Sequence, residues 1–495
     1  MEARGRELKQ HLPPARFGGE LLVSLPLDVL ELVCSSLTLK DRVALTFCCR
    51  RLWTRPDVTK SRRLWDVIEA YATHSSVVNR PVSLGHWLAR RKAAVGRLIV
   101  RGYMDGTNPA ALLAGLEDGA LASWELHEMD AIGTNPAGAL APLAHLGGLT
   151  ELKLQYCKVR RLPPQLSALT ALKVLDIADR MEPDGAQAAA AFAPLAALTQ
   201  LTALRLQHCG LCKLPRQLSA LSASLQFLDL ASNWDLGDWV AGSMRPLNSL
   251  SALTSLDMTR CGLPCIPPQL SAMGSLQQLQ LFGNDMTGAR PKSWEPLRRL
   301  TCLTLLDLAE CHIGYLPQQL ACLTALAELI LSYNSAMGDF LYLGGPEGDE
   351  ESSWQPLLSL GASLTCLRLS GCNIPELRAG FSGLSALVKL DLSRNVELGF
   401  DADTAFQPLS GLVGLKVLKM YSMQLKCIPP QLKMLPALAD LRLWNNRSLG
   451  EQGAALGQQL MELSALERLD LGGGIYCDPS TKEVVKLLRG RGVDV

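Results

Sequence analysis

A regular alternation of leucines and polar residues runs through most of the chain. The pattern Leu-x-x-Leu-x-Leu, with isoleucine or methionine allowed at its last position, starts at Leu149, Leu172, Leu201, Leu225, Leu253, Leu276, Leu303, Leu326, Leu364, Leu387, Leu415, Leu438 and Leu466. In each copy the leucines fall on one side of a short strand, and polar residues such as Lys153 fall on the other. One such strand cannot bury its apolar face alone, so the pattern predicts parallel strands stacked over a continuous core.

The spacing between copies alternates between a short and a long value. Successive starts lie 23, 29, 24, 28, 23, 27, 23, 38, 23, 28, 23 and 28 residues apart, so the true period is a pair of units of about 51 residues. Two weaker copies come first, at Val95-Leu98-Val100 and at Leu121-Trp124-Leu126. Together the copies predict a parallel sheet of about fifteen strands.

The ninth position of each unit indicates how the turn after the strand is held. Short units carry a thiol or thioether there, at Cys157, Cys209, Cys261, Cys311, Cys372 and Met423. Long units carry an amide there, at Asn233, Asn284, Asn334, Asn395 and Asn446, with Arg180 as the exception. A buried asparagine needs partners for its amide, so we expect it to bond backbone groups of neighbouring turns. Cysteine fills the same volume with only a weak donor.

The segments that return from one strand to the next also fall into two types. Short units continue with a Leu-Pro or Ile-Pro pair, as at Leu162-Pro163, which predicts an extended or one-turn return. Long units carry an apolar residue, any residue, and then Pro-Leu, which predicts a return that begins a helix at its proline. Trp294 and Trp354 occupy the apolar position, so we expect both to pack in the core.

These features resemble the leucine-rich-repeat family over about residues 95–476. The resemblance implies an α/β fold, a solenoid whose curved parallel sheet has about 15 strands and whose returns alternate between short non-helical and long helical segments. Its concave sheet would be a protein-sized surface, much larger than a metabolite pocket.

Residues that point outward from the strands predict where a target protein would bind. Aromatic and arginine side chains on an exposed sheet are the types that anchor interfaces. We expect the target site to include Tyr333, Arg368, Tyr421, Arg442 and Trp444. The alternative is a solvated face whose opposite charges pair across strands. The acidic loop 344–351 has two interpretations as well, a contact with a basic partner or a tolerated insertion.

The N-terminal segment has a different pattern. Residues 20–66 predict three short helices with an incomplete apolar core, and this segment resembles the F-box. The match is carried by Leu25, Pro26, Asp28, Val29, Leu30, Leu37, Asp41, Arg42, Cys49, Arg50, Trp53 and Trp65. The family often has leucine at the position of Arg42 and usually has valine at the position of Cys48. Both differences are mild departures from its pattern.

The F-box resemblance implies a substrate receptor of a cullin-RING ubiquitin ligase. Leu25, Pro26, Asp28, Leu30 and Leu37 would contact a Skp-type adaptor of the cullin complex, while the repeats hold a protein substrate. Catalysis would belong to partner subunits, so we expect no enzyme activity in this chain. The competing interpretation is a leucine-rich-repeat scaffold without any ligase, acting in signalling or cytoskeletal assembly.

These patterns divide the chain into parts. We expect a loose terminus over 1–19, the F-box over 20–66 and a helical linker over 67–94 that covers the first repeat. Degenerate repeats at 95–148, the regular solenoid at 149–476 and a C-terminal cap at 477–495 complete the chain.

Composition narrows the range of partners and locations. The chain has 48 Lys and Arg against 47 Asp and Glu, a net charge of +1 that argues against a nucleic-acid partner. No apolar run is long enough for a membrane span, and no secretory cleavage site is evident. The 15 cysteines follow the repeat instead of a disulfide framework, which predicts reduced thiols and a cytoplasmic or nuclear protein.

Two cysteine motifs could suggest other chemistry. Cys209 and Cys212 form a Cys-x-x-Cys pair, but no second pair follows at zinc-ligand spacing. Cys311 and His312 could suggest a nucleophile and its base, yet adjacent residues at a strand end point apart. We therefore expect no metal site and no cofactor.

Overall fold

The computed structural model contains one short parallel strand for each repeat. It describes residues 67–71, 97–101, 121–127, 132, 136–178, 188–238, 242–338, 354–452, 454–472 and 479–495. The described residues form two compact units. Those up to Gly210, with Gln217–Leu225, belong to the first unit, and Leu211–Arg216 and the residues from Gln226 onward belong to the second. Each unit is described by itself below.

The first unit contains strands that pair in parallel in chain order. They are β1 (Val67–Tyr71), β2 (Arg97–Arg101), β3 (Ser123–His127), β4 (Glu151–Gln155), β5 (Val174–Asp176) and β6 (Ala203–Arg205). Short helices form its returns: α11 (Pro136–Ala139), the 3-10 helices η1 (Ala141–His145) and η2 (Pro164–Ala168), α12 (Ala188–Ala191) and η3 (Ala193–Ala197). The 3-10 helix η4 (Arg216–Leu221) precedes the next strand.

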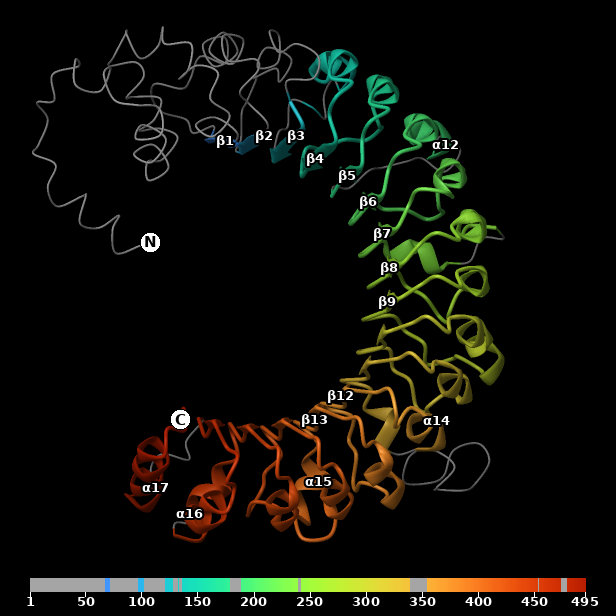
Figure 1. The fold of residues 1–495 in the computed structure, drawn as a ribbon. Coiled ribbons are helices and arrows are strands. Elements are labelled where there is room, and N and C mark those ends of the chain that lie inside the picture. Colours follow the sequence, from blue (N-terminus) through green and yellow to red (C-terminus); the bar gives the residue numbers. More distant parts are fainter. Residues whose placement is uncertain are drawn as a thin grey trace, which may run out of the picture. The chain divides into compact units, whose positions relative to one another are not determined.

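The second unit continues the same arrangement. Its strands are β7 (Phe227–Asp229), β8 (Ser255–Asp257), β9 (Gln278–Gln280), β10 (Leu305–Asp307), β11 (Glu328–Ile330), β12 (Cys366–Arg368), β13 (Lys389–Asp391), β14 (Val417–Lys419), β15 (Asp440–Arg442) and β16 (Arg468–Asp470). Adjacent strands are parallel and in register, so equivalent repeat positions lie side by side. In this unit the returns lie on one side of the strands, which leaves the other side of the sheet uncovered (Figure 1).

Returns of both lengths contain 3-10 helices. In the second unit these are η5 (Trp234–Gly237), η6 (Arg245–Ser249), η7 (Pro268–Ala272), η8 (Pro291–Arg299), η9 (Gln318–Cys322), η11 (Ala379–Gly383), η12 (Gln407–Gly411), η13 (Pro430–Met434) and η14 (Arg447–Gln452). The α-helices are α14 (Gln355–Leu358), α15 (Val396–Phe400), α16 (Ala454–Met461) and α17 (Pro479–Gly490).

The predicted contrast between non-helical and helical returns is therefore only partly correct. Short returns are single 3-10 turns, as the Leu-Pro pairs predict, but the long returns are also mostly 3-10. Some long returns gain their length from a second short helix near the strand end, such as η5 or α15, whereas the return after β9 contains the longer η8 alone. The prolines lie in the first turn of the helices that they begin, because a 3-10 turn tolerates a missing N–H there as an α-helix does.

The leucines of the repeat form the core in both units. In one copy of the pattern, Leu253, Leu256 and Met258 are fully buried. Trp294 and Trp354 are each 1% exposed, which confirms that they pack in the core. The core is a stack of equivalent apolar layers, so each repeat depends on its neighbours for burial.

Buried side chains at the ninth position connect the turns of neighbouring repeats. Asn284 Oδ1 accepts hydrogen bonds from the N–H groups of Cys261 and Leu263, at 2.9 and 3.0 Å. Its Nδ2 donates to the carbonyls of Met258 and Leu281, at 2.9 and 2.7 Å. The same four bonds recur at Asn334, Asn395 and Asn446. The predicted bonding of asparagine to backbone groups is confirmed.

The cysteines at this position make a weaker version of the same connection. Cys261 Sγ donates to the Leu230 carbonyl of the preceding repeat at 3.1 Å, and Cys311 Sγ donates likewise to Leu281 at 3.1 Å. Both side chains are fully buried. Both residue types therefore donate to a carbonyl of the preceding repeat. Asparagine does so through its amide and also accepts two bonds from backbone N–H groups, whereas cysteine supplies only a weak donor.

One expected helix is a strand. Residues 67–94 were predicted to be a helical linker, but Val67–Tyr71 form β1, which pairs in parallel with β2. This strand brings the number in the described residues to sixteen. The physical reason is that β2 would otherwise present an unpaired edge, and a segment rich in β-branched and aromatic residues satisfies that edge as a strand.

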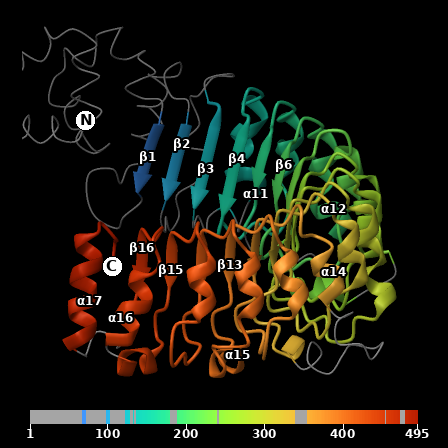
Figure 2. The ribbon, with the colours of Figure 1, turned by 60° about the horizontal axis from the view of Figure 1, so that its bottom comes forward.

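At the other end of the chain, two helices and a short bridge lie against the last repeat. α16 and α17 lie side by side (Figure 2). The chain then returns to β16, where the N–H of Leu469 donates to the Asp494 carbonyl at 2.8 Å and the N–H of Asp494 donates to Glu467 at 2.8 Å. The last strand edge is thus partly paired.

Several predictions fall outside the described residues. These are the F-box over 20–66 with Leu25, Pro26, Asp28, Leu30 and Leu37, the loose terminus over 1–19, and the acidic loop 344–351.

Candidate functional site

The uncovered side of the sheet in the second unit, here called the strand face, presents the third, fifth and seventh residues of each repeat. Its charge changes along the unit. The fifth positions of β7, β8 and β10 are Asp229, Asp257 and Asp307, whereas those of β12, β14 and β15 are Arg368, Lys419 and Arg442. Asp391 of β13 and Asp470 of β16 occupy the same position. The strand face is therefore acidic toward its β7 end, whereas from β12 to β16 it carries both charges with the basic residues in the majority.

The acidic residues have a structural role of their own. Asp257 Oδ1 accepts a hydrogen bond from the N–H of Thr259 at 2.8 Å, and Asp307 Oδ1 accepts one from Ala309 at 2.9 Å. Each carboxylate thus holds the backbone two residues further on, where the strand ends. Burial raises the pKa of Asp307, although the bond from Ala309 opposes this. The sequence alone did not indicate this use of aspartate.

A shallow hollow lies in the region from β12 to β16. It has a volume of about 290 Å³ and is lined by Cys366, Leu367, Arg368, Lys389, Leu390, Asp391, Val417, Lys419, Asp440 and Arg442. Four cationic side chains and two carboxylates line it. We call it the basic hollow. Its lining comes from four consecutive strands, β12 to β15, because equivalent positions lie side by side in register.

Some of the charges at the basic hollow are paired within the chain. Arg368 donates to Glu328 at 2.7 Å, and Arg442 donates to both carboxylate oxygens of Asp440, at 3.2 and 3.1 Å. The bond to Asp440 raises the pKa of Arg442. These pairs fix the orientation of two guanidinium groups at the edge of the hollow.

Other cations have weaker partners or none. Lys419 Nζ lies 3.8 Å from Asp391, whose Oδ1 already accepts a bond from the N–H of Ser393. Within the described part of the chain, Lys389 and Arg394 have no ion-pair partner, and both side chains are exposed. Positive charge is therefore available at the surface.

The register also places two like charges next to each other. Lys419 of β14 lies directly beside Arg442 of β15. Like charges at adjacent positions of neighbouring strands are destabilising. Asp391, 3.8 Å from Lys419, and Asp440, 3.1 Å from Arg442, offset part of this repulsion.

A row of aromatic and arginine side chains adjoins the basic hollow. The Arg394 guanidinium lies 6.0 Å from the centre of the Tyr333 ring and 5.8 Å from that of the Tyr421 ring. The Tyr421 ring meets the Trp444 ring edge-on at 6.1 Å. We call Tyr333, Arg394, Tyr421 and Trp444 the aromatic row. Trp444 is 42% exposed and Tyr333 is 43% exposed, so the row presents aromatic surface to solvent.

The backbone after each strand positions this row. The residue at the eighth position has a positive φ, +61° at Tyr333 and +60° at Arg394, and this directs these side chains across the neighbouring repeats. Glycines leave the space that the rings occupy. A Cβ at Gly371 would lie 3.0 Å from the Tyr333 ring, and one at Gly472 would lie 2.5 Å from the Trp444 ring. The row therefore depends on glycine in the repeats that it crosses.

The five residues predicted for the target site fall into these two features. Tyr333, Tyr421 and Trp444 belong to the aromatic row, and Arg368 and Arg442 line the basic hollow. Arg394, Lys389 and Lys419 were not predicted as site residues. Arg394 precedes Asn395 as Tyr333 precedes Asn334, so its shared repeat position was a signal that could have identified it. Whether these residues bind a target stays a prediction.

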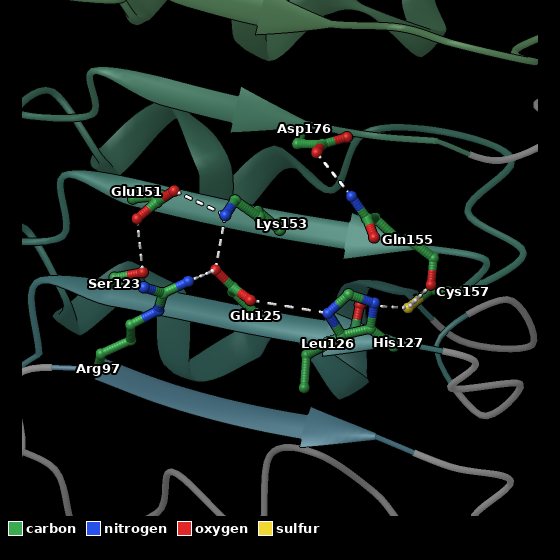
Figure 3. A network of polar contacts seen from close by, with 10 residues as sticks. All are labelled: Arg97, Ser123, Glu125, Leu126, His127, Glu151, Lys153, Gln155, Cys157 and Asp176. Atoms are coloured by element: carbon green, nitrogen blue, oxygen red, sulfur yellow. Dashed lines mark hydrogen bonds and ion pairs between the residues drawn. The ribbon is translucent and has the colours of Figure 1, made fainter. Parts of the chain in front are cut away.

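The strand face of the first unit carries a different arrangement, a network of ion pairs across β2 to β4 with a hydrogen bond from Gln155 to Asp176 of β5 (Figure 3). Glu125 accepts hydrogen bonds from Lys153, at 2.6 Å, and from Arg97. Lys153 also lies 2.9 Å from Glu151, which accepts a bond from Ser123 at 2.9 Å. Burial alone would raise the pKa of Glu125, but its bonds to Lys153 and Arg97 lower it overall. The charges here are satisfied internally, which favours a structural role.

The buried thiols are poor nucleophiles. Burial raises the pKa of Cys311 to about 12, and its Sγ donates to a backbone carbonyl. This thiol is therefore protonated at neutral pH, which argues against a Cys311–His312 nucleophile. Among the described residues there is no cluster of three or more His, Cys, Asp or Glu side chains able to hold a metal ion. No helix in this part of the chain is long and apolar enough to cross a membrane.

Comparison with known proteins supports the fold. A solved structure of a leucine-rich-repeat protein from Leptospira interrogans is similar to this chain, with a TM-score of 0.56 and 21% sequence identity. The similarity covers 82% of this chain and 97% of that chain. No family model matches the sequence, and no curated protein matches it. The chain thus has a leucine-rich-repeat fold, with a parallel strand in each repeat and short helical returns.

Proposed function

We propose that this protein is a binding receptor for another protein, and that the target binds the strand face of the second unit. The observation that carries the proposal is the exposed aromatic row beside the basic hollow. Aromatic and arginine side chains dominate the binding energy of many interfaces, and an exposed group of them on a rigid sheet is suited to this role. The predicted site residues Tyr333, Arg368, Tyr421, Arg442 and Trp444 belong to this surface.

We propose further that the receptor serves a ubiquitin ligase. The support is the F-box resemblance of residues 20–66, with Leu25, Pro26, Asp28, Leu30 and Leu37 as the contacts with a Skp-type adaptor. The chain would then bring its target close to a cullin-bound ubiquitin-charged enzyme and raise the local concentration of target lysines. The chain itself would supply no catalytic group. This function places the protein in the cytoplasm or the nucleus.

Co-purification with a Skp-type adaptor tests the ligase proposal. The full chain is co-expressed with the adaptor, and the adaptor is expected to be retained through size-exclusion chromatography. The Leu25→Ala/Pro26→Ala double variant is expected to lose it, because these residues supply the predicted apolar contact. Leu12 and Pro13 form a second Leu-Pro pair outside the motif, so Leu12→Ala/Pro13→Ala is the matched control and should retain the adaptor.

The alternative is a scaffold that binds proteins without a ligase. Failure of the wild-type chain to retain the adaptor would favour this alternative and would leave the strand-face proposal standing. Equal loss of the adaptor in both double variants would also count against the F-box assignment, because the effect would not be specific to the motif.

A further inference from the structure

Four side chains at the β14–β15 end of the strand face form a compact array of two cations and two aromatic rings. Lys419 and Tyr421 are two residues apart in one repeat, and Arg442 and Trp444 are two residues apart in the next. Lys419 and Arg442 are neighbours in register, and the two rings are in contact. The array thus pairs a cationic side with an aromatic side.

The cationic side carries an excess of positive charge. Its carboxylates are Asp391 beside Lys419, and Asp440 and Asp470 beside Arg442. Lys419 and Arg442 repel each other, and the basic hollow is lined by four cations against two carboxylates. Asp440 is shared, because it lies 3.1 Å from Arg442 and 3.5 Å from Arg468. A carboxylate placed between Lys419 and Arg442 would remove the repulsion and gain two charge-assisted hydrogen bonds.

The aromatic side defines what should accompany that anion. Tyr421 follows Lys419 by two residues, and Trp444 follows Arg442 by two residues, just past the ends of β14 and β15. In an extended chain this interval spans about 6.6–6.8 Å. An extended partner segment repeats the same distance between side chains that point the same way. An acidic residue and an aromatic residue two positions apart would therefore reach both sides of the array together.

We propose that the target segment is an extended acidic peptide carrying an Asp or Glu two residues from an aromatic residue. Its carboxylate binds Lys419 and Arg442, and its ring packs on Tyr421 and Trp444. The inference rests on the proposed binding of a protein by the strand face and specifies the chemistry of that partner. The positive charge of Lys419 and Arg442 favours an acidic segment, whereas the two aromatic rings alone would not distinguish it from other apolar segments.

The test uses the full chain and defined probes. Fluorescence anisotropy measures binding of a fluorescein-labelled peptide containing three Glu-Gly-Trp units, at an ionic strength of about 0.05 M, where surface charges are weakly screened. Peptides with Lys-Gly-Trp and with Glu-Gly-Ala units are measured in parallel. The first peptide is expected to bind at least about tenfold more tightly than either of the others, because each of those lacks one half of the match.

Matched variants place the binding on the array. Lys419→Ala and Trp444→Ala should each weaken binding of the Glu-Gly-Trp peptide by about fivefold or more, whereas Lys419→Arg should retain it. Lys433→Ala, on η13, and Trp234→Ala, on η5, remove an exposed lysine and an exposed tryptophan elsewhere in the same unit and should leave binding unchanged. Circular dichroism confirms that each variant is folded.

Three outcomes would overturn the inference. The first is that the wild-type chain does not bind the Glu-Gly-Trp peptide. The second is that Lys419→Ala and Lys433→Ala weaken peptide binding equally. The third is that a DNA oligonucleotide binds as tightly as the peptide and that Trp444→Ala does not change its affinity. The last would indicate a nucleic acid as the occupant. Adaptor retention is measured separately, so a failure here remains distinguishable from a failure of the ligase proposal.

Discussion

Asn284 Oδ1 accepts a hydrogen bond from the backbone N–H of Cys261, 23 residues earlier in the chain, at 2.9 Å. Together with its three other bonds, this contact satisfies four backbone groups that belong to two neighbouring repeats. The side chain is fully buried, so water cannot replace it. A single amide therefore connects the turns of two repeats, and stability in this fold depends on such contacts between neighbours.

Removing this amide should destabilise the second unit strongly. Asn284→Ala leaves buried N–H and C=O groups without partners, and we expect a loss of about 3 kcal/mol or more in the free energy of unfolding. Urea denaturation followed by circular dichroism measures the change. Asn373→Gly is the control, because Asn373 is exposed and has a φ of +54° that glycine adopts freely. The control should change stability by no more than about 0.5 kcal/mol. Equal losses in the two variants would contradict the assigned role.

A close approach between repeats predicts a second large effect. A Cβ at Gly399, in α15, would lie 2.0 Å from the carbonyl oxygen of Met423 in the next repeat. Gly399→Ala should therefore force the two repeats apart and cost about 3 kcal/mol or more. A Cβ at Gly383 would meet nothing within 4 Å, so Gly383→Ala should be nearly neutral. Thermal denaturation of both variants measures this difference. Equal shifts of the two midpoints would contradict the prediction.

The buried thiols predict a loss of stability in base. Burial raises the pKa of Cys261, Cys311 and Cys372 from 9.0 to about 12. Above pH 9 the unfolded chain loses these protons while the folded chain keeps them. The stabilising contribution of the thiols is therefore fully present below pH 9 and is lost as the pH rises toward 12. Each thiol should contribute a loss of about 2 kcal/mol near pH 10.5.

Urea midpoints at pH 8 and near pH 10.5 measure this loss. Cys261→Ala removes one of the three groups, so its stability should depend less steeply on pH than that of the wild type. Cys302 is exposed, and Cys302→Ala should keep the wild-type pH dependence. The comparison cancels the titration of other basic groups, which all variants share.

The first unit should lose stability in acid. The pKa of Glu125 is lowered in the folded chain, so its contribution is present above the unfolded pKa and disappears as the pH falls through the folded one. Glu125→Gln should destabilise the unit by about 2 kcal/mol at pH 7, since it removes the carboxylate that pairs with Arg97 and one of the two that pair with Lys153. The difference from the wild type should shrink below about pH 4 as the native carboxylate is protonated.

An exposed carboxylate provides the control for this network. Glu310 lies 4.0 Å from Arg260, and both side chains are more than 40% exposed. Glu310→Gln should change stability by no more than about 0.5 kcal/mol at any pH, because an exposed pair at this distance contributes little. A Glu125→Gln variant as stable as Glu310→Gln would show that the first-unit network does not stabilise the fold.

The repeat positions explain which features the sequence predicted. The strands, the buried leucines and the bonding of Asn284 follow from residues that recur at fixed spacing, because burial repeats with the same period. β1 has no copy of the leucine pattern, and its strand form follows from the edge of β2, which no local pattern reveals. The bond from the N–H of Thr259 to Asp257 is a local backbone contact, which the spacing of the leucines does not predict.

The candidate site was predicted only in part for a related reason. Arg394 reaches Tyr333 across an intervening repeat, where Gly371 leaves room for the ring. That contact depends on the positive φ of the eighth position. The alternation of residues along a strand does not predict this backbone conformation. The neighbouring charges of Lys419 and Arg442 were accessible from the sequence, because equivalent positions of successive repeats are paired in register.

The repulsion between Lys419 and Arg442 leads to a last prediction, which separates stability from binding. In a double-mutant cycle of Lys419→Ala, Arg442→Ala and the combined variant, the coupling energy in the free protein should be unfavourable by about 0.3–1 kcal/mol. Each single variant also loses its own carboxylate contact, and the cycle removes those separate losses. Repeating the cycle with the Glu-Gly-Trp peptide bound should reverse the sign, because a shared carboxylate makes the two cations support each other. A cycle that gives the same coupling with and without the peptide would mean that the anion binds elsewhere, whereas a reversed sign would explain why the fold retains a destabilising pair.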